Sequence, residues 1–138
     1  GAENLMATIC WTDPKGTIGP NTVNDRTPNL VNDLDIRITK NSTTHYPWKL
    51  DVENPSYGAT KGDNVVDNIE KVDISNASGT YTITVTHKGS LSGSSQAFSL
   101  IVTGISGSGG GGSGNYCSST YTESGSEYIT NVSFNCSK

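Results

Sequence analysis

The chain has 138 residues and a formal net charge of -4, which fits one ordinary domain with a mildly acidic surface. This charge disfavours nucleic acid as a partner, and no apolar run approaches the ~20 residues of a membrane-spanning helix. We therefore expect neither a nucleic-acid partner nor a membrane segment. The N-terminus lacks the order of a signal peptide, so any export signal is expected to lie outside this chain.

Short runs of strand-forming residues separated by turn residues follow one another along the chain, and no stretch has the apolar spacing of an amphipathic helix. Residues 3–12 are the first expected strand, and a loop rich in Gly, Pro, Asn and Asp follows it from 13 to 29. Further strands are expected in 34–40, after a turn in 41–50, and in 67–75, 79–88 and 96–104. This pattern predicts an all-β fold, an antiparallel β-sandwich or jelly roll.

The stretch LVNDLDIRI (30–38) places acidic residues inside one of these strands. Its apolar positions alternate at Leu34, Ile36 and Ile38, which puts Asp33 and Asp35 on the opposite face with Arg37. The pattern therefore predicts that these aspartates face away from the core and need not be buried.

The composition changes after residue 104. Residues 105–114 are almost entirely Gly and Ser and are typical of a flexible linker. The sequence thus divides into a domain at 1–104, this linker and a tail at 115–138, which contains one strand candidate at 127–134. So short a tail cannot bury a core alone. It either docks on the domain, pairs with another chain, or begins a further domain that is cut off here.

The three cysteines cannot all pair within one chain. Cys10 lies in the apolar run LMATICW and is expected to be a small buried side chain. Cys117 and Cys136 in the tail are the pair that could form a disulfide in an oxidising compartment.

Catalytic motifs are absent from the sequence. His45 and His87 have no nucleophile signature near them, and no P-loop, dinucleotide fingerprint or HExxH is present. We therefore expect this chain not to be an enzyme by itself.

Acidic residues are concentrated in the middle of the chain. Eight of the thirteen lie between residues 33 and 73: Asp33, Asp35, Asp51, Glu53, Asp63, Asp67, Glu70 and Asp73. Carboxylate and amide oxygens are the ligands that calcium takes, although the spacing is not that of an EF-hand. A calcium site built from separate loops is one hypothesis. The other is that these residues form turns and face water.

Aromatic residues gather in the same region. Tyr46, Trp48 and Tyr57 lie close together in the sequence, near His45. Surface aromatics at this density are typical of a platform that binds a polysaccharide or an extended peptide. The alternative is that Trp48 packs over one end of the sandwich.

Taken in order, these segments resemble the β-jelly-roll domain that follows the catalytic domain in many secreted subtilisin-like (S8 family) serine proteases. The resemblance rests on the following stretches: ATICWTDPKG (7–16), LVNDLDIRI (30–38), HYPWKLDVENP (45–55), GDNVVDNIEKVDI (62–74), GTYTITVTHKGSL (79–91) and QAFSLIVTG (96–104).

The resemblance implies a non-catalytic accessory domain that packs beside the protease domain in cis, stabilises it and in some members holds calcium or contacts substrate. The catalytic Asp, His and Ser of such enzymes belong to the preceding domain. By position, Asp35 matches a residue that can be a calcium ligand, and its companions would be Asp51, Asp63 and Asp67, with Asp33 beside it.

The tail NYCSSTYTESGSEYITNVSF is similar to the opening of the GEVED-type repeat of secreted and surface proteins of Bacteroidetes. The two resemblances together imply a bacterial protein that is secreted or held at the cell surface. We therefore expect an accessory domain of an exported subtilisin-like protease. The rival hypotheses are a binding module for polysaccharide or for insoluble protein such as collagen, and a structural, adhesin-like β-sandwich.

Overall fold

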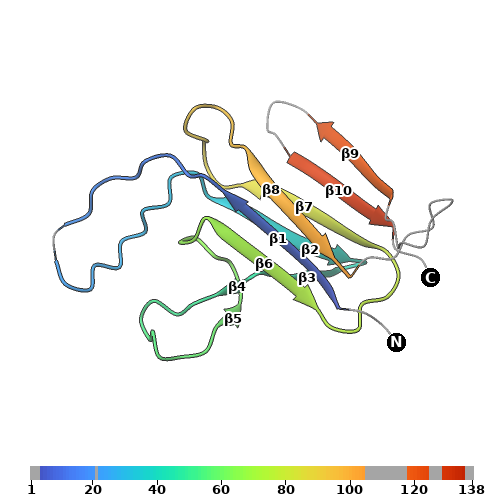
Figure 1. The fold of residues 1–138 in the computed structure, drawn as a ribbon, viewed down its shortest axis with the longest axis horizontal. Coiled ribbons are helices and arrows are strands. Elements are labelled where there is room, and N and C mark those ends of the chain that lie inside the picture. Colours follow the sequence, from blue (N-terminus) through green and yellow to red (C-terminus); the bar gives the residue numbers. More distant parts are fainter. Residues whose placement is uncertain (1–3, 21, 105–117, 125–128, 136–138) are drawn as a thin grey trace.

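The computed structural model describes residues 4–20, 22–104, 118–124 and 129–135, and the regular elements in these residues are all β-strands (Figure 1). The three-stranded sheet has the order β6-β1-β8 and consists of β6 (Ile69–Ile74), β1 (Leu5–Trp11) and β8 (Phe98–Thr103). The five-stranded sheet has the order β3-β2-β7-β10-β9 and consists of β3 (Thr43–His45), β2 (Leu34–Lys40), β7 (Tyr81–His87), β10 (Ile129–Asn135) and β9 (Ser118–Ser124). A separate hairpin pairs β4 (Trp48–Lys49) with β5 (Thr60–Lys61).

The two larger sheets pack against each other and bury one apolar core between them. Figure 1 shows β6, β1 and β8 lying over β2 and β7. The core consists of Leu5, Ala7, Ile9, Trp11, Leu34, Ile36, Ile38, Val72, Tyr81, Ile83 and Val85. Fully burying one such aliphatic side chain contributes about 1.5–3 kcal/mol. The prediction of an all-β, antiparallel β-sandwich is confirmed.

Alternation along β1 decides which of its side chains enter the core. Leu5, Ala7, Ile9 and Trp11 are buried, because successive side chains of a strand point to opposite faces. Cys10 falls on the other face and is exposed. The expectation of a buried Cys10 is therefore wrong, since an apolar run can still present every second residue to solvent.

Strand β2 follows the predicted alternation, but its second face is not open to water. Leu34, Ile36 and Ile38 are buried as expected, yet Asp35 on the opposite face is only 5% exposed. The alternation allowed both aspartates to be exposed, but Asp35 is buried and Asp33 is half-buried. The reason is that charged side chains from other segments cover this face.

Strand pairing extends to the tail. Strand β10 pairs antiparallel with β7, with Val132 opposite Ile83, and β9 pairs with β10 (Figure 1). The short strand β5 and strand β9 were not predicted from the sequence. The linker at 105–114 and the cysteines of the predicted disulfide, Cys117 and Cys136, lie outside the described residues. The division into domain, linker and tail stays a prediction.

Within the described parts of the chain, no helix has the length and apolar character that crossing a membrane requires.

Candidate functional site

Part of the edge of β2 is closed by a side chain instead of a strand. Strand β3 pairs only with the end of β2, from Ile38 onward, so no strand among the described residues covers the beginning of β2 on that side. The carboxylate of Glu70, which comes from β6 of the other sheet, accepts a hydrogen bond from the Ile36 backbone N–H at 2.8 Å. Glu70 is 1% exposed, so a buried carboxylate joins the two sheets at this corner.

Further charged side chains gather beside Glu70. Asp35 Oδ1 accepts hydrogen bonds from Arg37 Nη2 at 2.8 Å and from Lys88 Nζ at 2.9 Å. The same ammonium lies 3.0 Å from Asp63 Oδ1 and 3.3 Å from Asp33 Oδ2. We call this set the ion cluster: Asp33, Asp35, Asp63, Glu70, Arg37 and Lys88. Arg37 also pairs with Asp63, and its Nη1 lies 3.7 Å from Glu70 Oε2.

Lys88 is the cation that three carboxylates share. Burial by itself would lower the pKa of its ammonium, but hydrogen bonds to Asp35 and Asp63 outweigh burial and raise the pKa well above its ordinary value. At Asp63 burial acts to raise the pKa, yet the hydrogen bond from Lys88 leaves it below the ordinary value. Lys88 therefore stays charged and keeps its partner at Asp63 ionised.

Two other carboxylates of the ion cluster, those of Asp33 and Glu70, have a pKa above the ordinary value. Burial is the main cause that raises the pKa of Asp33, and burial raises the pKa of Glu70 to about 7 despite the hydrogen bond from Ile36. One oxygen of each, Asp33 Oδ1 and Glu70 Oε1, is buried with no hydrogen-bond partner among the described residues. Leaving a buried acceptor unpaired costs about 1–3 kcal/mol, which favours the protonated form.

The predicted calcium ligands are only partly brought together. Asp33, Asp35 and Asp63 meet around Lys88. Asp51 instead accepts hydrogen bonds from its own turn, at the Glu53 and Asn54 backbone N–H groups and the Asn54 side chain, and Asp67 accepts one from Asn64 at 3.0 Å. Among the described residues no group of three His, Cys, Asp or Glu side chains is arranged to hold a metal ion.

The three carboxylates that do meet offer the hard oxygen atoms that calcium takes. Lys88 Nζ, however, lies between them and occupies the position that a shared cation would need. The set fits calcium only if Lys88 moves away. Calcium binding stays a prediction.

The aromatic residues lie at the surface but do not form one flat platform. Tyr46 is 43%, Trp48 41% and Tyr57 64% exposed, and no ring contact among the three is recorded in the described structure. One face of each of two rings is covered, because Arg37 lies 4.8 Å from the ring centre of Tyr46 and Lys61 lies 3.9 Å from that of Trp48. Trp48 Nε1 also donates to Asp73. Trp48 is thus exposed and held in place.

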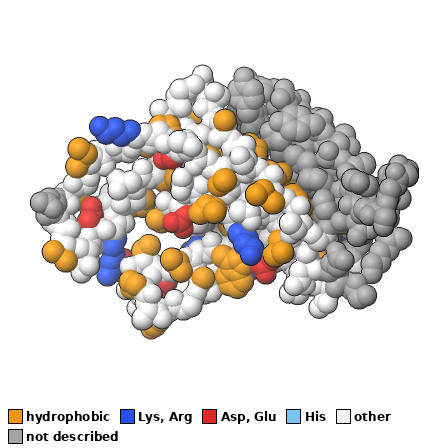
Figure 2. All heavy atoms as spheres, in the orientation of Figure 1, with side chains coloured by type: hydrophobic (Ala, Val, Ile, Leu, Met, Phe, Trp, Pro, Cys, Tyr) orange, Lys and Arg blue, Asp and Glu red, His pale blue; other side chains and the backbone are white. Residues whose placement is uncertain are grey.

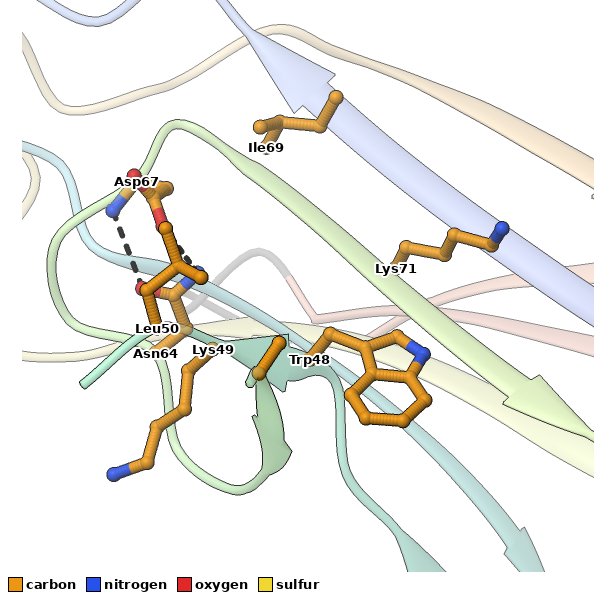
Figure 3. A pocket seen from close by; sticks show the side chains of 8 residues that line it. Trp48, Lys49, Leu50, Asn64, Asp67, Ile69 and Lys71 are labelled. Atoms are coloured by element: carbon orange, nitrogen blue, oxygen red, sulfur yellow. Dashed lines mark hydrogen bonds between the residues drawn. The ribbon is translucent and has the colours of Figure 1, made fainter. Parts of the chain in front are cut away.

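A groove of about 260 Å³ lies beside Trp48, between the β4-β5 hairpin and β6 (Figure 3). Its lining residues are Trp48, Lys49, Leu50, Ala59, Asn64, Asp67, Ile69 and Lys71. Figure 3 shows Trp48 on one side of this space and the hydrogen-bonded pair of Asn64 and Asp67 on the other. The groove is the second candidate site, and it includes one of the predicted substrate-binding aromatics and one of the predicted metal ligands.

The histidines have ordinary structural contacts. His87 Nδ1 lies 2.9 Å from the carbonyl oxygen of Gly89, and the ring centre of His45 lies 6.3 Å from that of Tyr81. Whether the chain is an enzyme is not decided by these contacts, and the absence of activity stays a prediction.

Comparisons with known proteins add no assignment: no family model, no curated protein and no solved structure matches the chain. The site therefore has to be interpreted from its own geometry. Sequence reasoning did not find the roles of Arg37, Glu70 and Lys88. Glu70 was one acidic residue among eight, but it stands two positions before Val72 in an alternating strand, and this spacing assigns it to the same inward face.

Proposed function

We propose that the chain is a non-catalytic accessory domain of an exported bacterial subtilisin-like serine protease, which stabilises the enzyme and contacts its protein substrate. The observation that carries this proposal is the ordered set of stretches that resemble the jelly-roll domain of such enzymes. Three of them contain the whole of β6, β7 and β8 of an antiparallel β-sandwich, which is the fold that the resemblance implies. Its partner is the protease domain in cis, and its location is outside the cell or on its surface.

The proposal has a direct test in two parts. The coding sequence upstream of Gly1 is expected to contain a subtilisin-like Asp, His and Ser triad. The purified chain is expected to leave casein and fluorogenic peptides intact, because its sequence contains no catalytic motif. Hydrolysis that copurifies with the chain through several columns, or an upstream sequence without a triad, would remove the proposal.

Calcium is the cofactor that this role implies, and the proposed ligands are Asp33, Asp35 and Asp63. Since Lys88 competes for the same oxygens, calcium is expected to stabilise a Lys88→Met variant more than the parent. A ligand at a hundred times its Kd adds about 2.7 kcal/mol to the free energy of unfolding. Melting temperatures measured in EDTA and in millimolar calcium check this. Identical temperatures in both solutions, for parent and variant alike, would discard calcium.

A second candidate function is a binding module for polysaccharide or insoluble protein. The exposed, fixed ring of Trp48 in the groove favours it. Retention on insoluble collagen or on cellulose, compared with a Trp48→Ala variant, tests this function. Equal retention of both proteins would show that Trp48 plays no part.

A further inference from the structure

Exposed apolar side chains are concentrated in one segment of the sequence, and three of them, Trp48, Leu50 and Ile69, line the groove. Eight of the twelve exposed large hydrophobic residues in the described chain lie between Tyr46 and Ile69. They are Tyr46, Trp48, Leu50, Val52, Tyr57, Val65, Val66 and Ile69. Figure 2 shows hydrophobic side chains at the surface in this part of the molecule, with charged side chains among them. The three that line the groove have polar and charged residues around them, an arrangement that is typical of a surface where another molecule binds.

The apolar lining of the groove consists of one aromatic ring and of aliphatic side chains. Trp48 presents a ring that is fixed by Lys61 and Asp73, so its ordering cost is met before a ligand arrives. Leu50 is 67% and Ile69 54% exposed, and both are aliphatic. Aliphatic walls gain by burying an apolar side chain but offer nothing to the hydroxyl groups of a sugar. These walls favour a peptide over a polysaccharide.

The charged side chains that line the groove indicate what charge a ligand should have. Lys49 and Lys71 line it, and neither has an ion pair among the described residues, whereas Lys61 pairs with Asp73. Figure 3 shows the ammonium groups of Lys49 and Lys71 directed away from the centre of the groove, toward different sides. Carboxylates on either side of a bound apolar side chain would meet these ammonium groups. The lining contains these two cations and one carboxylate, that of Asp67, so its net charge favours an acidic ligand over a basic one.

One acidic residue lines the groove. Asp67 Oδ2 accepts a hydrogen bond from Asn64 Nδ2, and its other oxygen has no recorded partner in the described structure. A free carboxylate oxygen at this position can accept a hydrogen bond from a backbone N–H of a peptide. The groove therefore offers an apolar contact, an acceptor and two flanking cations.

We propose that the groove beside Trp48 binds an extended peptide segment in which an apolar side chain is flanked by carboxylates. This inference rests on the substrate-contact part of the proposed function and names the class of segment that is contacted. Binding of a single short segment is expected to be weak, with a Kd of roughly 1 mM, because it buries little surface.

The test uses the full chain labelled with ¹⁵N and four soluble probes. The first three are blocked peptides: Gly-Asp-Glu-Leu-Glu-Asp-Gly, its analogue with Lys at every acidic position, and its analogue with Ser in place of Leu. The fourth is cellohexaose. The indole N–H resonance of Trp48, assigned with a Trp48→Phe variant, reports on the groove. We expect a saturable shift with the first peptide and at least tenfold weaker binding of the other probes.

A matched pair of variants tests the role of charge. Lys71→Glu is expected to weaken binding of the acidic peptide at least fivefold, while Lys15→Glu, which changes the net charge equally at an exposed position outside the groove, leaves it unchanged. Unshifted amide resonances outside the groove verify that both variants are folded.

The inference is overturned if the acidic peptide gives no saturable shift up to ~10 mM. It is also overturned if the basic or Ser peptide binds equally well, or if cellohexaose shifts Trp48 and the peptides do not. Each of these results leaves the accessory-domain proposal in place, because that proposal depends on the upstream triad and on the inactivity of the chain.

Discussion

Replacing Lys88 with methionine is expected to lower the free energy of unfolding by about 2–3 kcal/mol at pH 7. Methionine retains the apolar stem of the side chain but removes the ammonium that Asp33, Asp35 and Asp63 share. Asp35 is buried, so among the described residues its charge would keep Arg37 alone as an ion-pair partner. Breaking a fully buried ion pair costs more than this, and the partial exposure of Lys88 to solvent reduces the effect.

Chemical denaturation of the parent and the variant measures this loss. The control is Lys15→Met, because Lys15 is exposed and has no ion pair in the described structure. A change below about 0.5 kcal/mol is expected for this control, as for most surface substitutions. If Lys88→Met is no more destabilising than Lys15→Met, the ion cluster does not contribute to stability in the way that its geometry implies.

The second large effect is a dependence of stability on pH that arises from Glu70. Burial raises the pKa of this carboxyl from its ordinary value of 4.5 to about 7. A folded-state pKa above the unfolded value favours the folded state when the group is protonated. The contribution of Glu70 is therefore fully present below pH 4.5 and is lost as the pH rises through 7. By linkage, the loss amounts to about 3 kcal/mol.

A Glu70→Gln variant isolates this contribution. Glutamine can still accept the hydrogen bond from the Ile36 N–H, but it does not titrate. We expect the stability of the variant relative to the parent to rise between pH 4.5 and pH 8.5, as measured by urea unfolding at several pH values. The two histidines are present in both proteins and cancel in this difference. Parallel stability curves over this range would contradict the assignment.

The sequence was sufficient to predict the main strands, since alternation is visible in it directly. The bounds predicted for 34–40 are those of β2, and the strand predicted in 79–88 contains β7. The short strand β5 was missed because two residues are too few to carry a pattern. Cys10 was misplaced although the alternation of Leu5, Ala7, Ile9 and Trp11 in the same strand already assigns it to the outer face.

The candidate site was less predictable. The sequence indicated a concentration of acidic residues, but their partners depend on contacts between distant segments, as between Asp35 and Lys88, which are 53 positions apart. Periodicity predicts the face on which Asp35 lies and says nothing of what covers that face. The groove could not be predicted from the sequence either, because the β4-β5 hairpin and β6 come together only through folding.

Glu70 at the open side of β2 also bears on how the molecule behaves at high concentration. An unpaired strand edge is a template on which the strand of another molecule can add, and such addition leads to aggregates. Here the Ile36 N–H is already bonded to a buried carboxylate, and Arg37 and Lys88 place charge along the same stretch. The ion cluster therefore also hinders edge-to-edge association between molecules of this protein.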